Sequence, residues 1–365
     1  MKVSLIDPVG GHGGMDYYDY GLAMGLAANH LIVDYYTCNE TNERTYKNIG
    51  TEKVFKDVWD KKGIVKLYVF LFGYLKAFLS AKKNKSKVLH FQFFGLKQLN
   101  LIVLLIACFF SQKKVVTLHD IESFHKSGPK LVALLCLKLI DGIIFHNHFS
   151  KNEFEKKFNF KGLTTIIPHG NYLPFVTPKK LNKSGDTINL LFFGQLKKVK
   201  GVDTLLHAMK EVVEKSNQFH LTIAGRPWKT EAKEYIEKIK ELGLQKHVTT
   251  LFKYIKDEDV DKLYSKSSII ILPYKKIYQS GVLLLTLSYG RTVIASNLPP
   301  FKEIISDGEN GFIFSSEDCI SLSNCILKLN HKLISEVTER SNKLISYNYN
   351  WENIGGLTIK FYNSL

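Results

Sequence analysis

Short apolar runs alternate with longer mixed stretches along the whole chain. The run Asn189–Phe193 has the length and hydrophobicity of a buried strand, and Met1–Asp7 is predicted to be a short parallel strand. Between such runs, apolar residues recur at helical spacing, as Leu205, Leu206 and Met209 do. Strands that alternate with helices in this way predict doubly wound α/β domains with parallel sheets.

Residues 190–208 combine an apolar strand, a glycine, a basic loop and a helix. Gly194 ends the strand, and Lys197, Lys198 and Lys200 precede a second glycine and the helix. Backbone N–H groups at a helix N-terminus favour negative charge, and lysines add to that effect, so the stretch predicts an anion site. Taken alone, it is also compatible with a solvated loop that happens to carry lysines.

A glycine-rich loop, Gly10–Gly14, follows the first strand and precedes a helix from about Met15 to Asn29. Such a loop lets the backbone approach a phosphate or a sugar closely. A dinucleotide site is an alternative, because Asp34 lies about 20 residues beyond the loop, where a ribose-binding acid falls. The glycine spacing, however, fits G-x-G-x-x-G poorly.

Polar residues follow two predicted strands of the N-terminal half. His119 and Asp120 end the strand that begins at Val115, and His169 follows the strand Thr165–Ile167. Ligands of parallel sheets bind at the carboxyl ends of strands, so these side chains are placed to contact a sugar hydroxyl or a carbonyl. The structural alternative is a helix-capping aspartate beside a packed histidine.

The length of 365 residues suits two domains rather than one. Residues 174–186 hold two prolines, three lysines and a Ser-Gly pair, which predicts a linker. We therefore expect an N-terminal domain over residues 1–175 and a second α/β domain over residues 186–342. Residues 343–365 are expected to add an amphipathic helix that packs back on another part of the chain.

The net charge of +16 is concentrated in the N-terminal half. Residues 1–183 hold 26 Lys+Arg against 14 Asp+Glu, whereas residues 184–365 hold 24 against 20. Such a field attracts nucleic acid, acidic lipid headgroups or a phosphorylated substrate, and no groove-reading or base-stacking motif supports nucleic acid. The basic, aromatic-rich stretch Asp57–Lys87 predicts a surface helix, either half-buried on the sheet or resting on anionic lipid; the lipid interpretation agrees with the charge asymmetry.

No apolar run reaches the length expected of a membrane-spanning helix, and the longest block, Leu99–Phe110, predicts a buried core helix. The N-terminus enters a strand and a glycine loop without signal-peptide features, which favours a cytoplasmic protein. The five cysteines have neither disulfide nor zinc spacing. Cys108 and Cys136 lie in apolar runs and are expected to be core thiols in a reducing compartment.

Taken in order, the motifs of the chain resemble those of GT-B glycosyltransferases similar to glycosyltransferase family 4. They are GGHGG (10–14), TLHD (117–120), IIPHG (166–170), FFGQLKKVKG (192–201), LTIAG (221–225), ILPY (271–274), SGVLLLTLSYGRTVIAS (280–296) and FKEIISDGENGFIF (301–314). The resemblance covers nearly the whole chain. It implies two Rossmann-like domains that face each other across a cleft, with the C-terminal helix crossing back onto the N-terminal domain.

The resemblance also implies which residues bind the substrates. Lys200 matches a diphosphate-binding lysine, and the second cation of that motif falls at Gln195 or Lys197; we favour Lys197 because a diphosphate needs charge. His119 matches a histidine that contacts the transferred sugar, which makes His119, Lys200 and Lys197 the expected catalytic residues. The implied donor contacts are Gly13, Gly14, Gly194, Gln195, Tyr254, Ile255, Tyr274, Ser280, Gly281, Val282 and Glu303. The expected acceptor contacts are His12, Asp120 and His169.

The chain departs from the family pattern at two positions where many members carry glutamates. Here these positions fall near Ile277 and Leu285, so the donor preference of relatives does not transfer. Glu303, further along, is retained.

The function expected from the resemblance is retaining glycosyl transfer from a nucleotide sugar to a saccharide acceptor, without a cofactor or metal. The basic N-terminal half favours a polyprenyl-diphosphate-linked acceptor in surface polysaccharide or glycolipid synthesis, with the enzyme peripheral on the inner face of the cytoplasmic membrane. A nucleotide-sugar epimerase of the same fold and a non-catalytic saccharide- or nucleotide-binding partner remain alternatives. An NAD-dependent oxidoreductase is disfavoured by the second basic loop.

Overall fold

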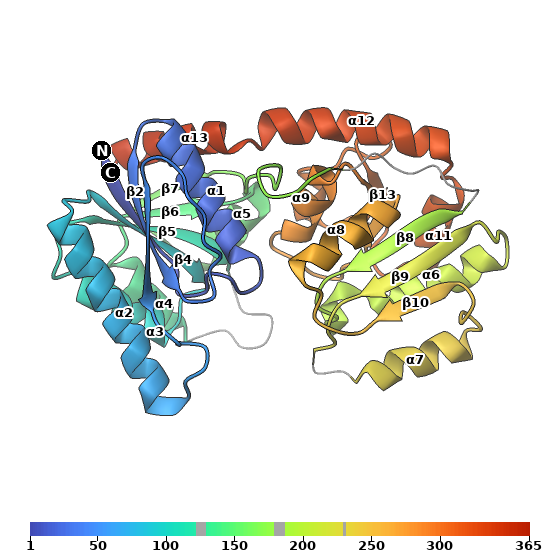
Figure 1. The fold of residues 1–365 in the computed structure, drawn as a ribbon, viewed down its shortest axis with the longest axis horizontal. Helices are drawn as coiled ribbons and strands as arrows, with labels where there is room; N and C mark the ends of the chain where they lie inside the picture. The colour runs from blue at the N-terminus through green and yellow to red at the C-terminus, as the bar shows by residue number, and fades with distance from the viewer. Residues whose placement is uncertain (122–128, 179–186, 229–230) are drawn as a thin grey trace. The chain divides into compact units, whose positions relative to one another are not determined.

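The computed structural model describes residues 1–121, 129–178, 187–228 and 231–365, which form two compact units. Unit 1 comprises residues 1–170 and 349–365, and unit 2 comprises residues 171–348 (Figure 1). Each unit holds one sheet whose described strand pairs are all parallel, with helices on its faces. The predicted pair of Rossmann-like α/β domains is therefore confirmed.

Unit 1 contains a seven-stranded sheet in the order β3-β2-β1-β4-β5-β6-β7. The central strands are near-continuous apolar runs because helices cover both of their faces. The elements in chain order are β1 (Lys2–Ile6), α1 (Met15–Ala28), β2 (Ile32–Cys38), β3 (Ile49–Phe55), α2 (Gly63–Lys83), β4 (Val88–Phe94), α3 (Gln98–Ala107), β5 (Lys113–Asp120), α4 (Lys130–Leu137), β6 (Gly142–Phe145), α5 (His148–Lys157), β7 (Leu163–Ile166) and α13 (Trp351–Asn363).

Alternate residues of β4 show which helices cover each face of this sheet. The ring of Phe91 packs edge-to-face on Phe78 of α2, with centroids 6.0 Å apart. The preceding residue, His90, is hydrogen-bonded through Nδ1 to the Tyr362 hydroxyl of α13 at 2.6 Å. Thus α2 covers one face, and α13 lies on the other together with α1. The amphipathic C-terminal helix therefore packs within unit 1, against α1.

Unit 2 contains a six-stranded sheet in the order β10-β9-β8-β11-β12-β13. Its elements are β8 (Ile188–Phe193), the 3₁₀ turn η1 (Lys198–Lys200), α6 (Val202–Val213), β9 (Phe219–Ala224), α7 (Ala232–Glu241), β10 (Val248–Leu251), α8 (Asp257–Lys266), β11 (Ile269–Leu272), α9 (Gly281–Ser288), β12 (Thr292–Ser296), α10 (Pro299–Lys302), β13 (Phe312–Phe314), α11 (Cys319–Leu327) and α12 (His331–Asn348).

The unit boundaries differ by several residues from the predicted ranges 1–175, 186–342 and 343–365. Helix α12 runs without interruption to Asn348 and packs on α9, so residues 343–348 stay with unit 2. The start of unit 2 is held by two hydrogen bonds, from the Asn171 side chain to the Ile345 carbonyl (3.0 Å) and from the Tyr172 amide to the Ser288 hydroxyl (2.9 Å). Residues 179–186 of the predicted linker lie outside the described residues.

The prediction of a buried core helix over Leu99–Phe110 was wrong. Helix α3 buries only Val103, Leu104 and Ala107, and the chain just beyond it leaves Cys108 exposed and Phe109 86% exposed. An apolar run without a polar face carries no signal for which side will be covered, so the sequence could not reveal this exposure. Cys108 is therefore a surface thiol rather than a core residue, whereas Cys136 is buried as expected.

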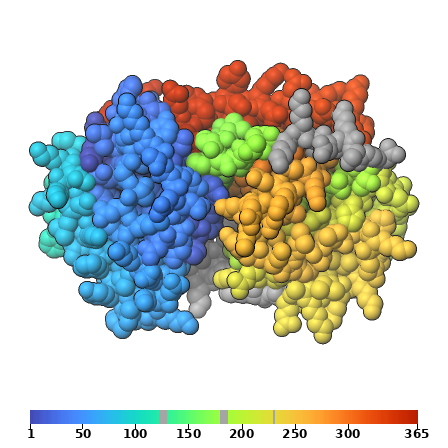
Figure 2. Space-filling model, viewed as in Figure 1, coloured from blue at the N-terminus to red at the C-terminus, as the bar shows by residue number. Residues whose placement is uncertain are grey.

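The expectation that no run could cross a membrane also needs correction. Among the described residues, the 21-residue helix α2 has the length and the apolar composition to cross a membrane. Only 28% of its most apolar 18-residue stretch is buried. Its atoms lie on the outside of unit 1, in light blue in Figure 2. The predicted surface helix within Asp57–Lys87 is thus present, and it is partly buried on the sheet.

The dinucleotide alternative is not supported by the position of Asp34. This residue is the third of β2, level with Ser4 of β1, and therefore lies away from the carboxyl ends of the strands where ligands bind. Its carboxylate pairs with Lys2 at 3.2 Å and accepts a hydrogen bond from Asn84 at 3.0 Å. The Asp34 carboxylate is therefore engaged by Lys2 and Asn84, away from the strand ends where the glycine loop begins.

Candidate functional site

In unit 1, the glycine loop between β1 and α1 is shaped by a buried aspartate. The Asp7 carboxylate accepts hydrogen bonds from the amides of Val9 and Gly10, each at 3.0 Å. Behind it lies Asp19 of α1, which accepts a hydrogen bond from the Tyr35 hydroxyl at 3.0 Å. Burial, together with the neighbouring charge of Asp7, raises the pKa of Asp19 well above its usual value. Asp19 can therefore stay protonated beside the Asp7 carboxylate.

The two ends of this loop differ in how much room they leave. A Cβ on Gly10 or Gly11 would collide with the turn at residues 37–41, so both glycines are required for packing. At Gly13 (φ 65°) a Cβ would meet nothing within 4 Å, so a ligand can approach the backbone there. Gly14 (φ 79°) is the N-cap of α1. The structure thus leaves space where Gly13 and Gly14 were predicted to close over a donor phosphate.

His12 lies at the exposed tip of the loop and packs on a tryptophan. Its ring centroid is 4.8 Å from that of Trp59, and the Trp59 indole N–H donates to the Pro8 carbonyl at 3.0 Å. Trp59 therefore fixes the loop from the side of α2, which sequence reasoning did not reveal.

The carboxyl ends of β5, β6 and β7 bring three histidines around Tyr18 of α1. The Tyr18 ring centroid lies 5.0 Å from that of His119, 5.2 Å from that of His146 and 4.9 Å from that of His169. The predicted residues His119 and His169 are therefore neighbours, and Asp120 ends β5 half-buried beside them. His146 was missed, although it directly follows β6.

These histidines are electrically neutral at neutral pH. Burial lowers the pKa of His146 to about 4 and, with the neighbouring His146, that of His169 to about 3; burial also lowers the pKa of His119 well below its usual value. His119 Nε2 is hydrogen-bonded to the Gln92 side-chain oxygen at 2.9 Å, while the buried Gln92 amide nitrogen has no hydrogen-bond partner among the described residues. Neutral imidazoles suit uncharged hydroxyl groups, which is the chemistry of a saccharide.

In unit 2, the basic turn after β8 packs tightly against the segment after β11. Gly201 (φ 67°) has no room for a side chain, because a Cβ would lie 1.8 Å from the Pro273 carbonyl oxygen. The Lys275 amide donates to the Val199 carbonyl at 2.8 Å. Close backbone approach therefore sets the position of η1 and the start of α6 relative to the segment that follows β11.

Lys200 is the cation held at this junction. Its Nζ lies 3.5 Å from the ring centroid of Tyr274, and the Lys200 side chain is half-buried. Tyr274 is itself buried, and its hydroxyl interacts with the Ser280 side chain. A lysine stacked on a buried ring loses little freedom when it binds an anion.

Lys197 has a different environment. Its Nζ lies 5.8 Å from the Trp228 ring centroid, and the neighbouring Gln195 is exposed. Lys197 and Lys200 therefore belong to the same turn but contact different aromatic rings, Trp228 and Tyr274.

The N-terminus of α9 lies beside the basic turn. The Ser280 hydroxyl accepts the Leu283 amide at 3.2 Å as the N-cap, and a Cβ on Gly194 would lie 3.8 Å from Val282. Gly281 follows the cap as the first residue of the helix. Two helix N-termini and Lys200 thus converge within unit 2, which is the arrangement expected for a bound diphosphate.

The other predicted donor residues follow β10 and the short helix α10. Tyr254 and Ile255 follow β10, where Tyr254 is 71% exposed and Ile255 is buried. Glu303 is exposed at the C-cap of α10, and Phe301 of the same helix packs at 5.5 Å on Tyr274.

The positions that carry glutamates in many relatives are filled by packing residues. Ile277 is buried, and Leu285 is half-buried on α9. Arg291, a residue without a signal in the sequence, is buried behind α9 and donates to the carbonyls of Tyr264 (2.7 Å) and Tyr289 (3.0 Å). It anchors the C-terminal end of α9 and contributes to the fold rather than to the anion site.

Over residues 1–121, 129–178, 187–228 and 231–365, no group of three or more His, Cys, Asp or Glu side chains is arranged to hold a metal ion.

Comparisons with known proteins agree with this geometry. Residues 176–351 match the family model described as glycosyl transferases group 1. A GDP-mannose:glycolipid 4-beta-D-mannosyltransferase from Xanthomonas campestris is 28% identical over 156 residues, covering 42% of this chain and 43% of that protein. The chain spans between 34% and 43% of the length of the first curated relatives it matches.

Two solved structures share the fold over the whole chain. Sucrose-phosphate synthase from Thermosynechococcus elongatus has a TM-score of 0.79 at 18% identity, covering 100% of this chain and 98% of that one. HepE from Anabaena, solved with UDP and glucose, has a TM-score of 0.73 at 18% identity and covers 100% of both chains. At these identities the likeness establishes the two-domain GT-B fold alone.

Proposed function

We propose that this chain is a glycosyltransferase of the group 1 type, whose family model its residues 176–351 match, and that it transfers a sugar from a nucleotide-sugar donor to a saccharide acceptor. The observation that carries the proposal is the convergence in unit 2 of Lys200 with the N-termini of α6 and α9. A nucleotide sugar leaves its diphosphate behind when the sugar departs. A cation and helix amides that are already in place stabilise that charge without reorganisation.

We propose that transfer retains the anomeric configuration, which is what the resemblance to glycosyltransferase family 4 implies. Glycosidases that retain configuration use a pair of carboxylates about 5 Å apart, and the predicted site residues supply no such pair. The residues that surround the basic turn instead position a diphosphate, so we propose that Lys200, Lys197 and the α9 amides assist its departure while His119 holds the sugar. We also propose that no bound metal is required, which predicts that transfer persists in excess EDTA.

The acceptor proposed is a saccharide on a polyprenyl diphosphate, extended at the inner face of the cytoplasmic membrane. Support comes from the basic unit 1 and from the relative named as a glycolipid mannosyltransferase. The neutral cluster of His119, His146 and His169 offers hydrogen bonds to saccharide hydroxyls. A polyprenyl-diphosphate-linked sugar should therefore be a much better acceptor than the same sugar free in solution.

The direct test of the donor assignment is a thermal-shift screen of the full chain against UDP, GDP, ADP and dTDP sugars. A donor that binds the folded state raises the melting temperature according to its concentration and affinity. One nucleotide class should stand out; if none shifts the transition, the donor site is refuted. Product analysis with the best donor then distinguishes transfer from epimerisation of the sugar and from binding without turnover.

A further inference from the structure

Helix α2 is apolar on two opposite sides. One side, with Gly73, Tyr74, Ala77 and Phe78, is buried on the sheet of unit 1. The other side carries Ile64, Tyr68, Phe72 and Leu79 at intervals of four or seven residues, and these side chains are 53–78% exposed. A helix at the surface of a water-soluble domain normally turns polar residues outward, so this exposed stripe requires a partner.

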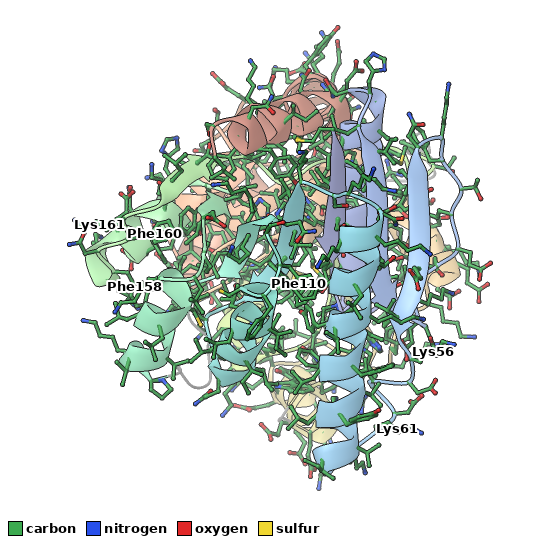
Figure 3. The ribbon with its side chains drawn as sticks, turned by 90° about the vertical axis from the view of Figure 1, so that its left-hand side faces the viewer. Lys56, Lys61, Phe110, Phe158, Phe160 and Lys161 are labelled. Atoms are coloured by element: carbon green, nitrogen blue, oxygen red, sulfur yellow. The ribbon has the colours of Figure 1, made fainter. Side chains whose placement is uncertain are left out.

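The neighbouring helices continue the exposed apolar surface. Helix α3 packs beside α2, and α4 packs beside α3. Leu105 of α3 is 50% exposed, Phe109 just after it is 86% exposed, and Leu131 of α4 is 67% exposed. Figure 3 faces this side of unit 1, with α2 running along it, Lys61 near its N-terminal end and Phe110 beside α3. We call the exposed apolar side chains of α2, α3 and α4, together with Phe109, the apolar face.

The apolar face is surrounded by positive charge, and the segment that contains α2 and α3 holds no acidic residue. Residues 61–119 contain eleven lysines and no aspartate or glutamate. Exposed lysines lie just before α2 (Lys61), at its last residue (Lys83), before α3 (Lys97) and at the C-cap of α4 (Lys138). An apolar centre with a cationic rim is complementary to the acyl chains and anionic headgroups of a lipid surface.

We infer that the apolar face is where the protein docks on an anionic lipid bilayer, with α2, α3 and α4 lying in the headgroup region. Docking would bring the protein to a lipid-linked acceptor, and this purpose rests on the proposed function. The argument that the face binds lipid does not depend on that function. A second copy of the chain is a poorer occupant, because two such faces would bring their lysine rims together and like charges repel.

Trp59 connects this surface to the glycine loop. Its ring is covered on one side by Lys66 of α2, whose Nζ lies 4.5 Å from the ring centroid, and it packs on His12 at 4.8 Å. The Trp59 indole also donates to the Pro8 carbonyl. The end of α2 and the tip of the predicted acceptor loop are therefore one contiguous structure, so docking places His12 next to the headgroups that present a lipid-linked saccharide.

The test is co-sedimentation of the full chain with phosphatidylcholine vesicles, prepared with and without phosphatidylglycerol. We expect binding only when phosphatidylglycerol is present, and weaker binding as salt is added. The double variant Phe72→Ser/Phe109→Ser should lower partitioning at least about ten-fold, since two large apolar side chains no longer enter the lipid. The matched control Ile236→Ser removes a side chain that is 53% exposed on α7, as Phe72 is on α2, and should bind like wild type.

A second pair of variants tests the charge. Lys82→Gln/Lys83→Gln should weaken binding about five-fold per lysine, whereas Lys233→Gln/Lys240→Gln on α7 should leave it unchanged. Equal losses in the variants and their controls would overturn the inference. So would a lipid-free dimer that Phe72→Ser/Phe109→Ser dissociates without affecting vesicle binding. The donor thermal shift, measured on the same proteins, reports on the proposed function separately: it should persist in every one of these variants.

Discussion

Replacing Lys200 with alanine tests the centre of the proposed mechanism. The Lys200 ammonium rests 3.5 Å from the Tyr274 ring centroid and belongs to a turn whose position is set by close backbone packing at Gly201. The variant removes the charge and leaves that packing intact. We therefore expect the loss to appear in the chemical step and not in the stability of unit 2.

The size of the effect follows from the position of the charge. At about 4 Å and an effective dielectric of about 20, two unit charges interact by about 4 kcal/mol. Loss of one preorganised stabiliser costs about 2.7–4 kcal/mol in measured enzymes. Because Lys200 is only half-buried, solvent screens part of its charge, and the lower figure applies. Lys200→Ala should therefore lower kcat about a hundred-fold.

The assay is the initial rate of sugar transfer over a range of donor concentrations, with kcat and KM determined separately. Lys198→Ala is the matched control, since Lys198 is an exposed lysine of the same turn, and its effect should stay within about two-fold. The melting temperature of Lys200→Ala should remain close to that of wild type, because the contact of Lys200 with the ring contributes only about 0.5–1 kcal/mol. A kcat within about three-fold of wild type, or an equal loss in both variants, would refute the assignment of Lys200.

Two further predictions concern unit 1. Gly355→Ala should lower the melting temperature clearly, because its Cβ would lie 2.2 Å from the backbone of Gly25 and force α13 away from α1. The control is Gly356→Ala, whose Cβ would meet only the Asn29 side chain at 3.5 Å; it should be neutral or slightly stabilising in thermal denaturation. The second concerns pH, because burial holds the pKa of His146 at about 4 in the folded protein against about 6.5 in the unfolded chain. The unfolded chain therefore binds the proton more tightly, and the free energy of unfolding falls as the pH drops from about 6.5 towards 4. At pH 5 the loss from this residue is about 2 kcal/mol. Urea denaturation at pH 8 and pH 5 should show a smaller pH-dependent loss of stability for His146→Gln than for wild type; equal losses in the two proteins would contradict the role of His146.

Local sequence patterns predicted much of the candidate site. The anion site after β8 was visible because a strand, a glycine, a basic turn and a helix are consecutive in the chain. The pairing of Lys200 with Tyr274 was not, because the two residues come from different βα units that meet only when β8 and β11 pair. Likewise, His119 and His169 were singled out from their places after strands, whereas their meeting around Tyr18 depends on the order of β5, β6 and β7 in the sheet.

By itself, the sequence determined the alternation of strands and helices, hence two parallel α/β units, and it located the glycine and lysine loops. Hydrophobic period and turn residues suffice for this because both act between neighbours in the chain. Tertiary structure alone decided which side of an all-apolar helix is covered. Leu99–Phe110 has no polar stripe to mark a solvent side, so its exposure depends on α2 and α4, which pack beside it and leave Phe109 uncovered. The apolar face is a property of three helices together, and no single segment encodes it.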